Sequence, residues 1–104
     1  MVLKVGVVSA GSWGTALAGM LAEKQYETVI WAREPEIVES VNSEHENKLF
    51  LPEIKLPESL KAVADIKDAV MGKDLVVVAT PAQHIRKSIE QIAGIISEKT
   101  FIVL

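Results

Sequence analysis

The fold is decided by residues 5–18, which read VGVVSAGSWGTALA. The stretch begins as an apolar strand, passes through a turn of small residues and opens a helix. Such a turn approaches a pyrophosphate closely, while the free N–H groups at the positive end of the helix face its charge. The pattern is Gly-x-Gly-x-x-Gly with Ser9 in the first glycine position and with Gly11 and Gly14 retained. It predicts a binding site for the phosphates of a dinucleotide.

Strand-like and helix-like segments alternate along the rest of the chain. Apolar, mostly β-branched runs predict strands at residues 2–8, 28–32, 60–64, 75–79 and 101–104. Helices are predicted after Gly14, from Pro35 to about Asn42, from a cap at Asp65 to Gly72, and from Ile85 to Ile96. The alternation predicts an α/β fold: a doubly wound parallel sheet of Rossmann type, in three layers, with strand order 3-2-1-4-5.

Residues 43–59 fit neither regular pattern. Pro52 and Pro57 interrupt this segment, which contains the apolar residues Leu49, Phe50, Leu51, Ile54 and Leu56. Because proline disrupts both helices and inner strands, we expect an ordered apolar loop. Loops of this length in a compact domain are often functional or packed by their own side chains.

The composition is typical of a soluble globular protein. The 104 residues suit one domain, and 49% of them are hydrophobic and 24% charged. The net charge of −3 and the few aromatic residues argue against a nucleic-acid partner. No apolar run approaches the roughly 20 residues of a membrane helix, and the N-terminus lacks the pattern of a signal peptide. We therefore expect a cytoplasmic protein without membrane insertion.

The sequence gives no support for a metal site or a cysteine nucleophile. The chain contains no cysteine, which excludes disulfides and thiolate ligands and fits a reducing compartment. His45 and His84 lack acidic or cysteine partners at ligand spacing, so we expect surface or loop roles for both.

Four blocks carry a resemblance to a known family. They are Ala10 to Ala18, Trp31-Ala32-Arg33, Asn47 to Pro52 with Leu56-Pro57, and Asp74 to Ala79 with Pro81-Ala82-Gln83. In this order they resemble the N-terminal part of the bacterial-type NAD(P)-dependent glycerol-3-phosphate dehydrogenases. A glycine-rich turn is common by itself, whereas its Ser-Trp-Gly-Thr continuation and the later blocks are specific. The resemblance covers essentially the whole chain.

The resemblance implies an activity and a set of cofactor-binding positions. The family reversibly reduces dihydroxyacetone phosphate to sn-glycerol 3-phosphate with NAD(H) or NADP(H), which feeds glycerophospholipid synthesis. The implied positions are Ser9, Ala10, Gly11, Ser12, Trp13 and Gly14 in the pyrophosphate turn, Arg33 and Glu34 at the adenosine ribose, and Pro81 and Gln83 on the nicotinamide side.

The resemblance also implies what lies outside this chain. Residues 1–104 correspond to a truncated N-terminal NAD(P)-binding domain, without the family's helical substrate domain and before its catalytic lysine. We therefore assign no catalytic residue and expect the chain to bind cofactor without turnover. The apolar run 101–104 also indicates a longer protein, because a buried strand rarely forms a bare terminus. For the full-length enzyme, a homodimer and a small-molecule substrate are expected.

Two positions depart from the family's pattern. Ser9 stands where the family usually has glycine, and serine suits this turn only if its backbone angles stay in ordinary regions and its side chain avoids the cofactor. Either the turn tolerates Ser9 or the serine weakens binding. Glu34 follows Arg33, where bacterial relatives often carry a second basic residue. Arginine suits a 2′-phosphate and an acidic residue suits a free 2′-hydroxyl, so we expect both NAD and NADP to serve.

Other interpretations stay open from the sequence. Trp13 could cover the start of the helix instead of touching the cofactor, and Arg33 could be a solvated charge at a strand end. The same N-terminal fold also serves 6-phosphogluconate and ketopantoate-type enzymes. A third alternative is a nucleotide-binding module without turnover, because a fold does not determine a function.

Overall fold

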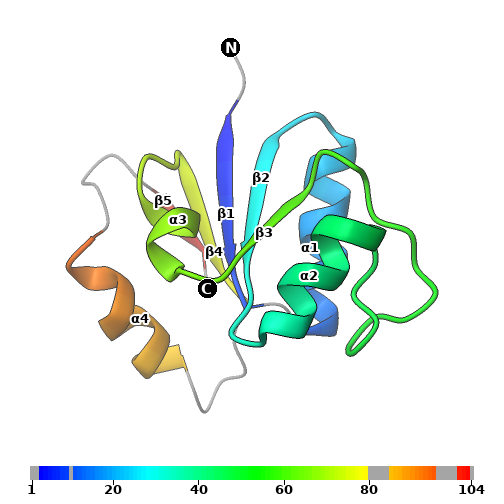
Figure 1. Cartoon of the computed structure of the whole chain (residues 1–104). Helices are drawn as coiled ribbons and strands as arrows, with labels where there is room; N and C mark the ends of the chain where they lie inside the picture. Colours follow the sequence, from blue (N-terminus) through cyan, green and yellow to red (C-terminus); the bar gives the residue numbers. More distant parts are fainter. Residues whose placement is uncertain (1–2, 10, 80–84, 96–100, 104) are drawn as a thin grey trace.

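The computed structural model of the chain describes residues 3–9, 11–79, 85–95 and 101–103, in which strands and helices alternate (Figure 1). The strands are β1 (Lys4–Val8), β2 (Glu27–Trp31), β3 (Lys61–Val63), β4 (Leu75–Val78) and β5 (Phe101–Val103). The helices are α1 (Ser12–Glu23), α2 (Pro35–Glu44), α3 (Ile66–Val70) and α4 (Ile85–Ala93).

The strands form one parallel sheet in the order β3-β2-β1-β4-β5, as predicted. β1 lies between β2 and β4, and Val7 pairs with Ile30 on one side and with Val77 on the other. The chain therefore winds outward from β1 in both directions. The carboxyl ends of β1 and β4 meet where the winding direction changes, which is where open α/β sheets bind their ligands.

Each face of the sheet is covered by a pair of helices (Figure 1). Val5 and Val7 belong to a buried cluster with residues of α1 and α2, whereas Val8 belongs to a second cluster with residues of α3 and α4. Neighbouring residues of a strand point to opposite faces, so a strand buried on both sides is apolar throughout. The result is the predicted three-layer architecture.

The short helix α3 is fixed both at its start and against the sheet. Asp65 Oδ1 accepts a hydrogen bond from the Lys67 backbone N–H at 3.0 Å, which confirms the predicted cap. A β-carbon at Gly6 would overlap the carbonyl oxygen of Ala69. Glycine therefore allows the backbone of α3 to reach β1.

The edge strand β3 is covered by a side chain of α2. This helix continues two residues beyond the predicted end at Asn42. The Asn42 amide donates to the Ala62 carbonyl at 2.9 Å and accepts from the Ala62 N–H at 2.8 Å. These two bonds satisfy backbone groups that an edge strand would otherwise leave open to another chain.

Helix α4 packs its apolar side on the sheet. Ile92 is 1% exposed and joins the second core cluster, in keeping with the predicted isoleucine spacing. The helix ends at Ala93, and the predicted end at Ile96 lies outside the described residues. No helix in the described part of the chain is long and apolar enough to cross a membrane.

The loop between α2 and β3 places an apolar side chain of its returning part in the core. Leu56 is buried in the first core cluster, as an ordered apolar loop would require. In contrast, Leu49, Phe50 and Ile54 are 42–55% exposed. These residues lie in the middle of the loop, which extends away from the sheet (Figure 1).

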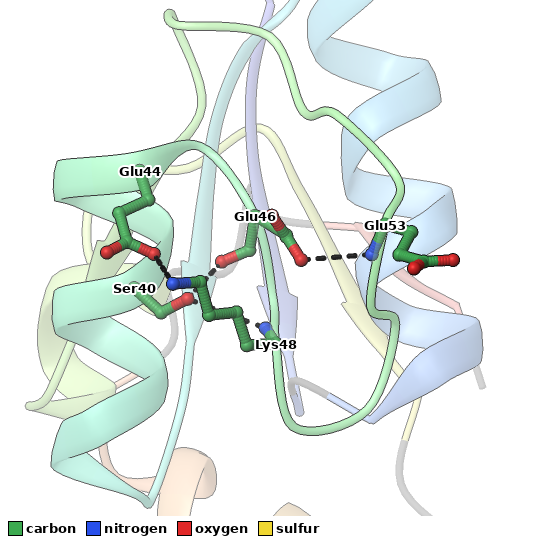
Figure 2. Close-up of polar contacts among 5 residues, drawn as sticks. All are labelled: Ser40, Glu44, Glu46, Lys48 and Glu53. Atoms are coloured by element: carbon green, nitrogen blue, oxygen red, sulfur yellow. Dashed lines mark hydrogen bonds and ion pairs between the residues drawn. The ribbon is translucent and has the colours of Figure 1, made fainter.

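Polar contacts hold the beginning of this loop against α2 (Figure 2). The Ser40 hydroxyl donates to the Glu46 carbonyl, and the Glu46 carboxylate accepts from the Glu53 N–H at 2.9 Å. Lys48 forms an ion pair with Glu44. The hydrogen bond that Lys48 donates to the Glu44 carboxylate is the main reason why the pKa of Lys48 is raised above its ordinary value. The loop is irregular in shape but has a defined structure.

Candidate dinucleotide-binding site

The β1–α1 turn brings the N-terminus of α1 to the carboxyl end of β1. Gly11 is the N-cap residue, and its carbonyl accepts the first helical hydrogen bond from the Thr15 N–H at 2.9 Å. No side chain of the described residues caps this helix end, and its first turn contains no acidic residue. Its first-turn N–H groups are therefore suited to donate to an anion.

The two glycines of the turn have different surroundings. A β-carbon at Gly14 would lie 2.6 Å from the Ser9 carbonyl oxygen and 3.3 Å from Ala79 Cβ. At Gly11, the nearest atom would be Ser9 Oγ at 3.9 Å. Gly14 therefore allows α1 to pack closely against the ends of β1 and β4, whereas Gly11 leaves the turn open to the approach of a ligand.

Ser9 is held in a backbone conformation that favours glycine. Its φ is 115°, so the condition that its backbone angles stay in ordinary regions is not met. The Ser9 N–H donates to the Trp31 carbonyl at 3.3 Å, and Ser9 Oγ accepts from the Gly11 N–H at 3.4 Å. The turn accommodates serine because packing against β2 and α1 fixes the backbone, at a cost in strain of about 1–3 kcal/mol.

Arg33 and Glu34 lie beyond the carboxyl end of β2, which neighbours β1 in the sheet. Arg33 is exposed, and its guanidinium pairs with no residue in the described ranges. Glu34 is half-buried and is the N-cap residue of α2, with its carbonyl accepting from the Ile37 N–H at 3.1 Å. The arginine thus offers an unpaired positive charge, whereas the backbone of Glu34 has a structural role.

Trp13 is 64% exposed, which disfavours the interpretation that it packs over the helix start. Ser12 beside it is also exposed. The structure thus brings Ser9, Gly11, Ser12, Trp13 and Gly14 together in one turn.

Several predicted site positions fall outside the described residues. These are Ala10, Pro81, Gln83 and His84. His45, which is described, ends α2 in the left-handed conformation with φ 57°. Among the described residues there is no group of three or more histidine, aspartate or glutamate side chains that could hold a metal ion.

One buried polar pair next to this turn has no signature in the sequence. Asn47 and Thr15 are both 0% exposed, and Asn47 Nδ2 donates to Thr15 Oγ1 at 2.8 Å. Asn47 belongs to a block that carries the family resemblance, but a single asparagine in an irregular segment gives no sign of being buried. The pairing spans 32 positions and is visible only in the folded chain.

A parallel sheet whose winding reverses at a glycine-rich turn and an uncapped helix end defines a dinucleotide-binding domain of the Rossmann class. Residues 4–104 match the family model of the NAD-dependent glycerol-3-phosphate dehydrogenase N-terminus. The chain belongs to this family.

Individual relatives agree with the family match. The glycerol-3-phosphate dehydrogenase (NAD(P)+) of Parvibaculum lavamentivorans is 48% identical over 101 residues, which cover 97% of this chain and 30% of the relative. The solved structure of the Coxiella burnetii glycerol-3-phosphate dehydrogenase is 33% identical, with a TM-score of 0.88 over 97% of this chain and 31% of that one. The solved structure of the Saccharomyces cerevisiae glycerol-3-phosphate dehydrogenase is 30% identical, with a TM-score of 0.91 over 98% of this chain and 33% of that one.

The chain therefore spans about a third of the length of these relatives. The matches favour glycerol-3-phosphate dehydrogenase over the 6-phosphogluconate and ketopantoate-type alternatives. They also place the chain in an NAD(P)-dependent family whose N-terminal domain binds the cofactor.

Proposed function

We propose that residues 1–104 form the dinucleotide-binding domain of an enzyme that interconverts sn-glycerol 3-phosphate and dihydroxyacetone phosphate with NAD(P)+ and NAD(P)H. The observation that carries the proposal is the uncapped N-terminus of α1 at the point where the sheet reverses its winding, in a chain of this family. The reaction is assigned to the whole enzyme, and cofactor binding is assigned to this chain.

The pyrophosphate is assigned to the turn formed by Ser9, Ala10, Gly11, Ser12, Trp13 and Gly14. The first-turn N–H groups of α1 supply hydrogen bonds, and the helix dipole adds a favourable partial charge. The open space beside Gly11 supports a close approach of the phosphate oxygens. Ser9 Oγ lies 3.4 Å from the Gly11 nitrogen and so competes only weakly for this N–H.

The adenosine ribose is assigned to Arg33 and Glu34. The unpaired guanidinium of Arg33 suits the 2′-phosphate of NADP(H), and the Glu34 carboxylate suits the free 2′-hydroxyl of NAD(H). We therefore expect the chain to bind both cofactors.

The nicotinamide side is assigned to Pro81 and Gln83, which follow β4 in the sequence. The bound cofactor supplies the hydride chemistry, and the residues of this chain hold and orient it. We assign the acid/base lysine to a part of the enzyme beyond residue 104. A cytoplasmic homodimer that serves glycerophospholipid synthesis completes the proposal.

Calorimetric titration of the chain with NADH and NADPH tests the proposal. We expect saturable one-to-one binding of each and no binding of glycerol 3-phosphate alone; failure of both dinucleotides to bind would contradict it. The longer protein should oxidise glycerol 3-phosphate, and a preference for 6-phosphogluconate or pantoate would favour the alternative enzymes. Cofactor binding without turnover of any of these would favour a nucleotide-binding module.

A pair of matched substitutions locates the site. Trp13→Glu places a negative charge in the first turn of α1, whereas Met20→Glu places the same charge at an exposed position farther along the helix. We expect Trp13→Glu to raise the Kd for NADH about tenfold through charge repulsion, and Met20→Glu to change it less than about twofold. An acidic residue near a helix N-terminus stabilises the helix, so unfolding would not explain the loss. Equal effects of both variants would contradict the assigned position.

A further inference from the structure

The first turn of α1 is joined to the α2–β3 loop through a side-chain hydrogen bond that is shielded from water. The donor is Asn47 Nδ2, and the acceptor is Thr15 Oγ1 at 2.8 Å. Both residues are fully buried. Leaving either polar group without a partner in this environment would be unfavourable, so the pair fixes the separation of two segments distant in the sequence.

Asn47 is itself fixed by its own loop. Its Oδ1 accepts from the Phe50 N–H at 3.1 Å, and its backbone carbonyl accepts from the Leu51 N–H at 2.9 Å. The side-chain amide thus uses its oxygen within the loop and its nitrogen toward α1. Aspartate and leucine have a similar size, but neither can make both contacts.

Thr15 connects the fixed side chain of Asn47 to the β1–α1 turn. Its N–H makes the first hydrogen bond of the helix, to the Gly11 carbonyl, and it follows Gly14 directly. The same loop also touches α1 farther along, where a β-carbon at Gly19 would lie 3.2 Å from Leu56 Cδ2. The loop therefore holds α1 by a polar contact at its first turn and by apolar packing near its middle.

We propose that Asn47 is a positioning residue of the dinucleotide site, and that it acts through Thr15 to hold the first turn of α1 in the orientation that presents its N–H groups to the pyrophosphate. This inference rests on the proposed function. The end of α1 has no side-chain cap, so the direction of these N–H groups depends on how the helix is held. A contact that supports a ligand-binding group from the protein side restricts the positions which that group can adopt.

Thr15→Val removes the acceptor with little change in shape, and Thr15→Ser retains it. At a temperature where circular dichroism shows each variant folded, we expect Thr15→Val to raise the Kd for NADH about tenfold, and Thr15→Ser to raise it less than about twofold. In the absence of NADH, the amide of residue 15 should exchange with solvent about tenfold faster in Thr15→Val, with the amides of β1 and β4 unchanged.

Two asparagine variants separate positioning from a general loss of stability. Asn47→Ala should raise the Kd at least as much as Thr15→Val, because it removes the contact with Thr15 and also the hydrogen bond from the Phe50 N–H. The double variant should raise the Kd by less than the product of the two single effects, because the two substitutions share one contact. Asn42→Ala also removes side-chain hydrogen bonds, but at β3, away from the turn. It should lower the unfolding midpoint without changing the Kd or the exchange at residue 15.

Three results would overturn the inference: an unchanged Kd in Thr15→Val, additive effects in the double variant, or a loss of affinity in Asn42→Ala as large as in Asn47→Ala. Failure of the unmodified chain to bind NADH or NADPH would instead contradict the proposed function. The exchange experiment, which needs no cofactor, then tests whether the contact between Asn47 and Thr15 holds the first turn of α1 in place. A local increase at residue 15 supports it, and no change overturns it.

Discussion

The β1–α1 and β2–α2 turns both lead from a strand into a helix, but they are constrained in different ways. In the first turn, Ser9 has a φ of 115° and Gly14 has no room for a β-carbon. In the second turn, Glu34 has an ordinary φ of −85° and Arg33 is exposed without a partner among the described residues.

This difference separates two properties of the proposed cofactor site. The first turn is held by backbone packing, so substitutions there change the shape of the site and the stability of the fold together. The second turn presents a charge on a backbone that any residue can adopt, so we expect substitutions there to change which cofactor is preferred and to leave the fold intact.

The largest effect is expected at the glycines of the first turn. Gly14→Ala forces a β-carbon against the Ser9 carbonyl and should lower the free energy of unfolding by about 3 kcal/mol. Gly11→Ala meets only Ser9 Oγ at 3.9 Å and should change stability by less than about 1 kcal/mol while weakening NADH binding. Urea unfolding and calorimetry of both variants check this, and equal destabilisation by the two would refute the distinction.

At the second turn, Arg33→Gln should weaken NADPH binding about tenfold more than NADH binding. The substitution removes the guanidinium and with it a charge-assisted contact with the 2′-phosphate. The unfolding midpoint should not change, since the side chain is exposed. Arg86→Gln, at an exposed position on α4, is the control and should affect neither cofactor. Parallel loss of both cofactors in Arg33→Gln would show that the charge attracts any dinucleotide and does not select between them.

Relief of strain at Ser9 should have a smaller effect. Ser9→Gly should raise the free energy of unfolding by about 1 kcal/mol, because glycine adopts a positive φ without steric conflict while the unfolded chain gains some freedom. Ser9→Ala retains the β-carbon and should give no such gain. Thermal or urea unfolding distinguishes the two, and a stabilised Ser9→Ala would assign the effect to the hydroxyl group instead of the backbone.

The smallest effect is expected away from both turns, at the exposed Glu44–Lys48 pair (Figure 2). The pKa of Lys48 is raised above its ordinary value of 10.5. The ion pair therefore stabilises the fold below pH 10.5, and this stabilisation is lost as the pH rises through the raised pKa. Glu44→Gln should lower the thermal midpoint at neutral pH by about 1 °C or less. The difference from the unmodified chain should disappear at strongly alkaline pH, and a larger or pH-independent difference would contradict the ion-pair explanation.

The sequence predicts the arrangement of the sheet because the valine-rich strands and the turn glycines are local signals. Asp65 was predictable as a cap for the same reason, since its partner is two residues away. The φ of Ser9 was not predictable, because serine favours ordinary backbone angles and only packing against α1 and β2 overrides this preference. The exposure of Phe50 was not predictable either, because an apolar residue in an irregular segment carries no sign of which way it points.

For the candidate site, the sequence predicts the turn but not the buried contact next to it. The motif predicts which residues form the turn, since spacing encodes it. The contact between Asn47 and Thr15 depends on how the α2–β3 loop folds back over α1, and no local pattern encodes that path.

The central claim is that a dinucleotide binds at the first turn of α1, and amide chemical shifts of the ¹⁵N-labelled chain during a titration with NADH test it most directly. The claim predicts the largest shift changes at Gly11, Ser12, Trp13 and Gly14, a smaller change at Arg33, and none in α3 or β3. Changes concentrated in α3, in β3 or in the exposed part of the α2–β3 loop, with the first turn of α1 unaffected, would contradict it.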